Sequence, residues 1–412
     1  MVRLVYIAGP VLAAVTALAQ GTAGGGKSMA DASELTARAQ VASAAQTAFG
    51  LRLLGTLAKE GPHHNVFVSP SSVFLALGML ESGAAGGTRS ALRGTLSVPQ
   101  DVSEAALHES ASALSSLLQQ PGGAELSIAN ALWADRRVTL APDFVALCRQ
   151  IYHAHAETLD FNNPDAADTI NAWVKANTGN KIADIVSARA VSGSVAILTN
   201  AVYFKGKWQH PFDKKLTQNG AFHRADQTEK QVPLMHQPGL KNVYLSGDGY
   251  EAAVLPYGPP QMDEGGLVLC VLLPQPGNDV ADVLAKVDVR RLLDHEEPVE
   301  LDLRLPRFTL DFSASLKMAL AQMGMRVAFD YGAADFSPLG SREFFVGDVL
   351  HKTRLEVDEE GTVAAAATAI LAPMGMPRPL DKKVMTVDRP FALLLCDRQT
   401  GAVLFAGLVY DP

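Results

Sequence analysis

One stretch near the C-terminus, residues 353–379, constrains this chain of 412 residues more than any other. Residues 353–357 alternate between polar and apolar side chains, which is typical of a half-buried strand. A glycine and a run of residues no larger than valine follow, and residues 371–379 then contain three prolines. Because prolines at this density oppose both a helix and a central strand, the pattern predicts a strand that continues into a small-residue hinge and an exposed loop.

The small residues of the hinge suit a segment that inserts into a sheet as a new strand. Thr362, Ala364, Ala366 and Thr368 would share one face of that strand, because side chains alternate along it. None carries a charge, and an unpaired charge buried on this face would be costly. Propensity alone favours an alanine-rich helix instead, which Gly361 and the prolines would limit to about three turns. The rest of the chain must decide between these readings.

A series of short motifs decides in favour of the inserting strand. Residues 65–72 read N-x-F-x-S-P-x-S, residues 83–88 read G-A-x-G-x-T, and residues 200–212 read N-x-x-x-F-K-G-x-W-x-x-P-F. Further matching segments lie at 170–174, 305–308, 334–337, 351–352, 359–368 and 388–391. Each motif alone is weak, but in this order they resemble the motifs of the serpins, the serine protease inhibitor family, over residues 45–412.

The resemblance implies an α+β fold. We expect one serpin domain over residues 45–412, with three β-sheets, about eight or nine helices and an exposed reactive-centre loop at about 359–386. No linker or internal repeat interrupts this range. The hinge resembles that of members that inhibit, and its residues are Glu359, Gly361, Thr362, Ala364, Ala365, Ala366, Ala367 and Thr368.

By resemblance, the function is that of a suicide inhibitor of serine-type endopeptidases. A target protease would attack the loop and form an acyl-enzyme, and the cleaved loop would insert into the central sheet as serpin loops do. About 15 inserted residues at ~3.3 Å each would carry the protease roughly 50 Å, and distortion of its site would trap the acyl-enzyme. The native fold must then be a kinetic trap. Two alternatives stay open: a non-inhibitory serpin with a carrier, chaperone or storage role, and an inhibitor of cysteine proteases.

The position of the reactive bond follows from the family spacing. Counted from Glu359, this spacing gives Gly375–Met376, and Met374–Gly375 is one residue away. Proline follows both Met376 and Arg378, which opposes cleavage after either residue. These residues predict an elastase-, chymotrypsin- or subtilisin-like target.

The resemblance also assigns residues beneath and above the central sheet. Four polar residues are expected to meet beneath its opening, where they satisfy one another by hydrogen bonds: Ser69, Ser72, Asn171 and His351. A catalytic serine–histidine pair is the less favoured reading, and we expect no enzyme. Trp208 should lie at the top of the sheet, where the hinge enters, and Glu359 should pair there with Arg307 as an exposed ion pair of little stabilising effect.

The N-terminus resembles a secretory signal peptide. Arg3 precedes an apolar run, and Ala17 and Ala19 fit a small-x-small cleavage site, so residues 1–19 would be removed and residues 20–44 would form a flexible leader. We therefore expect a secreted, extracellular or periplasmic protein. The alternative is an ordinary cytosolic N-terminus.

Composition excludes several partner classes. The net charge is −8 and the basic residues do not cluster, so we expect no nucleic-acid or membrane partner. Some serpins bind sulfated polysaccharides through a basic helix near the position of residues 101–120. This segment contains no lysine or arginine here, so the resemblance implies no polysaccharide cofactor, and a monomer is the simplest state. Three cysteines without a C-x-x-C motif read as buried free thiols: Cys148, Cys270 and Cys396.

Two candidate binding segments lack the features that their chemistry requires. Residues 21–28 fit G-x-x-x-x-G-K-S, but the preceding run reads as a signal and not as a core strand. His153, His155 and Glu157 alternate along a strand, yet their spacing matches no zinc motif. We expect neither a cofactor nor a metal ion.

Overall fold

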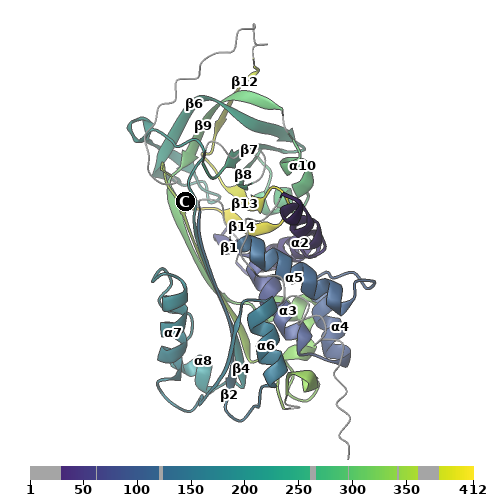
Figure 1. Ribbon diagram of the computed structural model, residues 1–412. Coiled ribbons are helices and arrows are strands. Elements are labelled where there is room, and N and C mark those ends of the chain that lie inside the picture. Colours follow the sequence, from purple (N-terminus) through teal and green to yellow (C-terminus); the bar gives the residue numbers. More distant parts are fainter. Residues whose placement is uncertain are drawn as a thin grey trace, which may run out of the picture.

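The computed structural model (Figure 1) describes residues 29–61, 63–119, 124–259, 266–295, 297–340, 343–360 and 380–412. The predicted signal peptide lies outside the described residues. So do the hinge from Gly361 to Thr368 and the reactive-bond candidates Met374, Gly375 and Met376. The prediction of a flexible leader over residues 20–44 was wrong from Met29 onward, because the helix Met29–Ala58 begins there.

A five-stranded sheet carries the strand that leads into the hinge. Its strands, in spatial order, are β10 (Phe308–Ser315), β11 (Asp348–Val357), β4 (Ala196–Lys205), β2 (Glu125–Asp135) and β3 (His155–Leu159). Buried and half-buried residues alternate along β11, which confirms the predicted strand. β11 and β4 run parallel and are hydrogen-bonded directly to each other, from the pair Asp348 and Ile197 to the pair Leu355 and Phe204.

The other strands form one hydrogen-bonded set. They are β1 (Val66–Val68), β14 (Val403–Val409), β13 (Phe391–Asp397), β8 (Leu267–Pro274), β7 (Tyr250–Pro256), β6 (Glu229–Gly247), β9 (Pro298–Pro306), β12 (Lys382–Thr386) and β5 (Gln218–His223). We expected three sheets, but β6 has 19 residues and passes through a bulge between Gln237 and Leu240, so that it pairs with β5, β7 and β9. This long strand joins two of the expected sheets into one.

Ten α-helices occur among the described residues, slightly more than expected. They are α2 (Met29–Ala58), α3 (Pro70–Ser82), α4 (Gly86–Thr95), α5 (Glu104–Leu118), α6 (Pro142–Ile151), α7 (Ala166–Asn177), α8 (Ala188–Ser192), α9 (Val280–Leu284), α10 (Val289–Leu293) and α11 (Lys317–Leu320). Short turns of 3-10 or π type lie at Lys214–Leu216, Ala321–Met325, Arg326–Phe329 and Ser337–Leu339.

The five-stranded sheet is covered on both faces. α7 and α3 lie on opposite sides of it (Figure 1). Asn200 on β4 contacts Ser72 of α3, whereas the next residue, Ala201, packs against Val174 of α7. Successive side chains of a strand point to opposite faces, so β4 is buried almost throughout.

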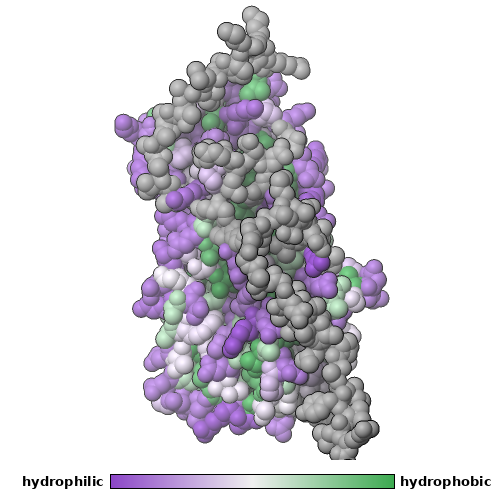
Figure 2. Space-filling model, viewed as in Figure 1, coloured by the Kyte–Doolittle hydropathy of each residue, from purple (hydrophilic) through white to green (hydrophobic). Residues whose placement is uncertain are grey.

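The outer surface is mainly polar. Figure 2 shows hydrophilic residues over most of the coloured part of this face, with hydrophobic residues in small separate groups. Within the described ranges, no helix is both long and apolar enough to cross a membrane. Cys148, Cys270 and Cys396 are buried and form no disulfide.

Candidate functional site

A buried polar cluster lies beneath the boundary between β4 and β11, which we call the seam. His351 on β11 stands opposite Asn200 on β4, and its Nδ1 lies 2.5 Å from Asn200 Oδ1. The other ring nitrogen, Nε2, accepts a hydrogen bond of 3.1 Å from the backbone N–H of Ser69. Because Nε2 accepts, Nδ1 carries the proton and the imidazole is neutral. Burial lowers the pKa of His351 to about 3, which agrees with the neutral form.

Three further residues complete this cluster on the α3 side. Ser72 Oγ donates to Asn130 Oδ1 at 3.1 Å, and Asn200 Nδ2 donates to Ser72 Oγ at 2.5 Å. Ser69 caps the N-terminus of α3, and its Oγ donates to the carbonyl of Leu404 at 2.7 Å. We call Ser69, Ser72, Asn130, Asn200 and His351 the seam cluster; each is at most 2% exposed.

Asn171 does not belong to the seam cluster, so the prediction that it would join was wrong. It lies on α7, on the opposite face of the sheet. Its Nδ2 donates to the carbonyl of Val186 at 2.9 Å, and its Oδ1 accepts from the N–H groups of Ile185 and Val186 at 2.9 and 3.1 Å. The side chain therefore fixes the segment that follows α7.

Sequence reasoning missed Asn130 and Asn200, which supply the amides of the cluster. Each is a single asparagine in the buried part of a strand whose other residues are mainly apolar. A buried amide requires a hydrogen-bond partner. This requirement could have indicated that both asparagines belong to a buried polar cluster.

Trp208 closes the top of the seam. Its Nε1 donates to the carbonyl of Asp358 at 2.7 Å, directly after β11 ends, and its ring stacks on Tyr257 with centroids 4.2 Å apart. The backbone N–H of Phe212 donates to the carbonyl of Glu359 at 2.9 Å. These contacts hold the chain up to the residues just before Gly361.

Glu359 and Arg307 form the expected ion pair, with Arg307 Nη1 3.3 Å from Glu359 Oε1. The side chain of Arg307 is 51% exposed, but that of Glu359 is only 4% exposed. Thr217 Oγ1 also donates to Glu359 Oε1, at 2.9 Å. The expectation of an exposed pair was wrong for the carboxylate, because it lies inward between Thr217 and Arg307. Removal of Arg307 would therefore leave a buried carboxylate short of a partner, which costs more than breaking an exposed pair.

Lysines hold the neighbouring acidic residues. Lys205 Nζ lies 3.0 Å from Asp358 Oδ2 and 3.4 Å from Glu356 Oε2, and Lys214 pairs with Glu360. Hydrogen bonds with Asp358 raise the pKa of Lys205 above its ordinary value. Residues 356–360 are thus fixed by several contacts at once.

A family model described as serpin (serine protease inhibitor) matches residues 44–412. This chain is a serpin. Among its relatives, the human leukocyte elastase inhibitor is 33% identical over 90% of this chain and 99% of its own length. An uncharacterized serpin-like protein of Thermococcus kodakarensis is 34% identical over 85% of this chain and 82% of its own length.

Solved serpin structures share the fold. Arabidopsis AtSerpin1, in a form described as the native stressed conformation, aligns over 92% of this serpin and 98% of its own chain, with a TM-score of 0.79 and 27% identity. Serpin-12 of Manduca sexta aligns over 89% and 98%, with a TM-score of 0.78 and 26% identity. The α+β serpin fold expected from the motifs is confirmed.

The geometry of Ser69 and His351 does not fit nucleophilic catalysis. The imidazole accepts from the backbone N–H of Ser69, while Ser69 Oγ donates to a carbonyl oxygen and not to the imidazole. Neither side chain is accessible to a substrate, since their exposures are 2% and 0%. The pair is a structural element of the seam.

Of the two alternating histidines, only His155 lies in β3, whereas His153 precedes the strand, and His155 makes an aromatic contact. His155 stacks on Trp173 of α7 with centroids 5.2 Å apart, and its Nε2 lies 2.8 Å from Glu157 Oε2. In the described part of the chain, no group of three or more His, Cys, Asp or Glu residues could hold a metal ion.

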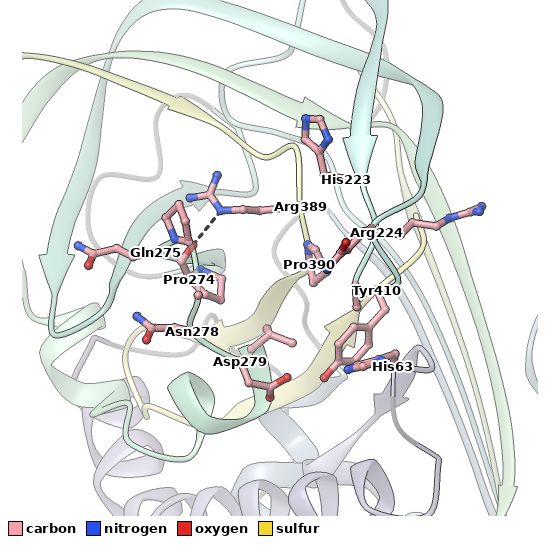
Figure 3. A pocket seen from close by; sticks show the side chains of 15 residues that line it. His63, His223, Arg224, Pro274, Gln275, Asn278, Asp279, Arg389, Pro390 and Tyr410 are labelled. Carbon is pink, nitrogen blue, oxygen red and sulfur yellow. Dashed lines mark hydrogen bonds between the residues drawn. The ribbon is translucent and has the colours of Figure 1, made fainter.

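A hollow of about 470 Å³ lies on the large sheet, away from the seam (Figure 3). Its charged side chains already have partners within the protein. Arg389 Nε donates to the carbonyl of Pro274 at 2.9 Å, His223 lies 3.3 Å from Glu229, and Asp279 caps α9. We assign it no role in inhibition.

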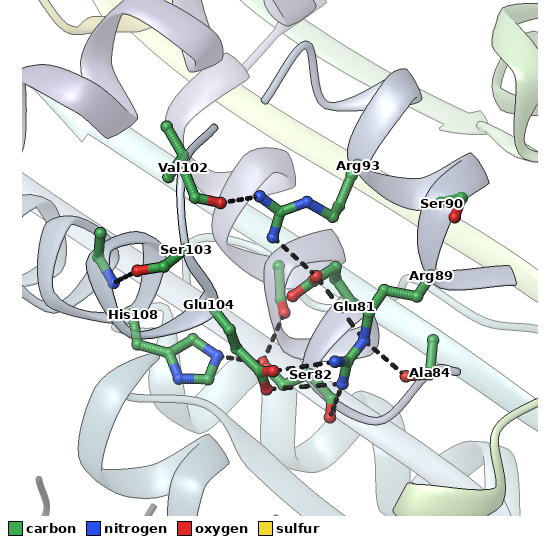
Figure 4. A network of polar contacts seen from close by, with 12 residues as sticks. Glu81, Ser82, Ala84, Arg89, Ser90, Arg93, Val102, Ser103, Glu104 and His108 are labelled. Atoms are coloured by element: carbon green, nitrogen blue, oxygen red, sulfur yellow. Dashed lines mark hydrogen bonds and ion pairs between the residues drawn. The ribbon is translucent and has the colours of Figure 1, made fainter. Parts of the chain in front are cut away.

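A charged network lies at the far end of α3 (Figure 4). Glu81 is fully buried, and its Oε1 lies 3.3 Å from Arg93 Nη1. Arg89 Nη1 lies 2.9 Å from Glu104 Oε2, and His108 Nε2 lies 2.8 Å from Ser82 Oγ. Burial raises the pKa of Glu81 and lowers that of His108. These contacts tie α3 to α4 and α5, so α3 is fixed at both ends.

Proposed function

We propose that this serpin is a suicide inhibitor of serine-type endopeptidases that traps its target by inserting the cleaved loop at the seam. One observation carries the proposal. β4 and β11 are parallel neighbours, and β11 continues directly into the small-residue hinge. A strand that turns back at Gly361 would run antiparallel to both and lie between them.

Insertion at this position is energetically favourable. It replaces one parallel pairing by two antiparallel pairings, which are slightly more stable per residue. It also satisfies new backbone hydrogen bonds with a segment whose inward residues, such as Thr362 and Ala364, are small and uncharged. The energy released would pull the bound protease along the sheet before deacylation.

The seam cluster controls this step. The hydrogen bond between His351 and Asn200 crosses the seam, so it must break when a strand enters. The contacts of Trp208 and Glu359 hold the top of β11 until then. The native sheet stays closed because these polar bonds are satisfied only in the closed arrangement.

The target would be a protease that accepts Met374 or Gly375 before the cleaved bond. This choice favours an elastase-, chymotrypsin- or subtilisin-like enzyme, and the relationship to the human leukocyte elastase inhibitor supports it. We also propose that residues 1–19 direct secretion, so that the inhibitor meets its target outside the cytosol.

The test is incubation with elastase, chymotrypsin, subtilisin and trypsin, followed by denaturing gels and mass spectrometry. A covalent complex that survives SDS, together with a released C-terminal peptide, would support the proposal and locate the cleaved bond. Cleavage by these enzymes without a complex, and without a gain in thermal stability, would favour a non-inhibitory role. If a complex forms with a cysteine protease but with none of these serine proteases, the protein would instead be an inhibitor of cysteine proteases.

A further inference from the structure

The described part of the chain exposes five large hydrophobic side chains, and they lie at two opposite ends of the molecule. Three of them lie near the two ends of the reactive-centre loop: Leu216, Leu380 and Val384. The other two are Met318, which is 61% exposed, and Tyr331, which is 69% exposed. Exposed apolar side chains indicate an interaction surface when they belong to a continuous patch, so the surroundings of these two residues decide what they can do.

Met318 and Tyr331 lie at the end of the five-stranded sheet that is farthest from the loop. α8, which directly precedes β4, lies at the bottom of the molecule in Figure 1, whereas β12, which follows the loop, lies at the top. β11 runs parallel to β4, so it begins at the bottom with Asp348. The N–H of Leu316, directly before α11, donates to the carbonyl of Val349 at 2.8 Å, which places α11 at this end. We call this end the base.

Lys317 connects the apolar side chains at the base. Its Nζ donates to the carbonyl of Gly347 at 2.9 Å and lies 5.7 Å from the ring centroid of Phe329. Phe345, two residues before Gly347, packs edge-on against Tyr331 with ring centroids 5.7 Å apart. Phe329 and Phe345 are half-buried, and the next residue after Lys317 is the exposed methionine of α11. We call these four apolar residues the basal patch: Met318, Phe329, Tyr331 and Phe345.

An inserted loop would bring the attached protease to the base. A strand that turns back at Gly361 and runs antiparallel to β11 would pass the start of β11 at about residues 371–374. The residue proposed to carry the acyl bond, Met374 or Gly375, would then lie at the end of the seam or at most about four residues, roughly 13 Å, beyond it. Phe345 lies three residues before β11, so the basal patch borders the place where the protease would be attached.

We propose that the basal patch is a second contact surface for the target protease, which packs against it after the loop has inserted and is therefore released more slowly. The inference rests on the proposed function. A protease whose catalytic site is distorted exposes apolar residues that its ordered form buries, and these residues suit a surface of methionine and aromatic side chains. Contact with the distorted form alone shifts the protease away from the ordered form that could hydrolyse the acyl bond.

The basal patch is remote from the first encounter with the protease. The ten residues of β11 separate it from the hinge by roughly 33 Å, at ~3.3 Å for each residue. Substitutions in the patch should therefore change the release of the protease and not the rate at which the complex forms. Because Met318 and Tyr331 are more than half exposed, their replacement should shift Tm by no more than about 2 °C.

The experiment uses whichever of the four serine proteases forms the covalent complex. The complex is purified away from free protease, and the return of proteolytic activity is followed over time with a chromogenic peptide substrate. Met318→Ser/Tyr331→Ser should release active protease about tenfold faster than the wild type, as expected for the loss of two apolar contacts. The rate of complex formation by this double variant should stay within about twofold of the wild-type rate.

Two further variants are matched controls. Met318→Leu/Tyr331→Phe keeps the apolar surface of the patch and should release the protease at the wild-type rate. Val384→Ser removes a side chain of similar exposure, 65%, at the loop end of the molecule. It should leave the release rate unchanged, because this end no longer holds the protease after insertion.

The outcomes separate this inference from the proposed function. Equal release rates for the wild type and Met318→Ser/Tyr331→Ser would overturn the inference alone, as would equal acceleration by Val384→Ser. If the free wild type sediments as a dimer and the double variant as a monomer, the patch is an interface between copies of this chain and the inference is wrong. If the wild type forms no complex with any protease, the inference fails together with the proposed function.

Discussion

His351 and Asn200 face each other across the seam between two parallel strands, and their hydrogen bond joins β11 to β4 from beneath the sheet. Both residues are fully buried, and every other member of the seam cluster bonds to one of them directly or through Ser72. The closed sheet thus depends on a neutral imidazole in this position.

Acidification should destabilise the protein through His351. Its pKa is about 3 in the folded protein and 6.5 ordinarily, so between these values the unfolded chain binds more protons and stability falls as the pH falls. The loss from this group on going to pH 5 is about 2 kcal/mol. Thermal melts at pH 7 and pH 5 should show a larger decrease for the wild type than for His351→Gln, which does not titrate. Parallel decreases in both proteins would contradict the prediction.

A charge at the start of the hinge should convert the inhibitor into a substrate. Thr362→Arg places a cation on the inward face of the inserted strand, where it would be buried without a partner. Complex formation on denaturing gels should fall at least about tenfold while cleavage continues. Val363→Glu is the matched control, since residue 363 should face outward and the variant should still form the complex. Full inhibition by Thr362→Arg would rule out insertion of this face.

The ion pair at the top of the seam should contribute measurably to native stability. Arg307→Met leaves the buried carboxylate of Glu359 with Thr217 as its remaining side-chain partner, at a cost of about 1–2 kcal/mol. Arg354→Met is the control, because Arg354 pairs with the half-exposed Asp311 and should cost less than about 1 kcal/mol. The free energies of unfolding of the two variants and the wild type would be compared by urea unfolding, with one slope of free energy against urea concentration fitted to all three. Similar losses of unfolding free energy in both variants would mean that the burial of Glu359 does not increase the cost of removing its partner.

Secretion should remove the first 19 residues. Expression of the full chain in a secreting host should yield a mature protein that begins at Gln20, because Ala17 and Ala19 fit the cleavage site. N-terminal sequencing of the protein outside the cells would check this. Retention in the cytosol with an intact Met1 would contradict the signal-peptide interpretation.

Local patterns in the sequence anticipated the strands of the site well. Alternation predicted β11 from a few residues. The family motifs brought Ser69, Ser72 and His351 together correctly and anticipated the contact of Glu359 with Arg307. These contacts follow from the order of elements, which the motifs specify.

The sequence did not allow a prediction of which face of the sheet each helix covers. Asn171 lies on α7, and no local sequence pattern indicates on which face of the sheet this helix packs. The predicted position of Asn171 was therefore on the wrong face. The continuity of β6 could not be predicted either, because prolines oppose a continuous strand, whereas this strand contains Pro233 and accommodates Pro238 in a bulge.

The strand that follows the reactive-centre loop bears on how many protease molecules one inhibitor molecule could trap. β12 is paired with β9 from Lys382 to Thr386, and Lys382 also lies 3.0 Å from Glu300, so the far end of the loop is tied to a different sheet from its near end. If the loop inserts as proposed and β12 stays paired with β9, the chain between these two anchors must be cut, and a cut chain cannot be restored. Each molecule would then trap a single protease molecule. The number of inhibitor molecules supplied, more than their affinity, would set how much protease is removed.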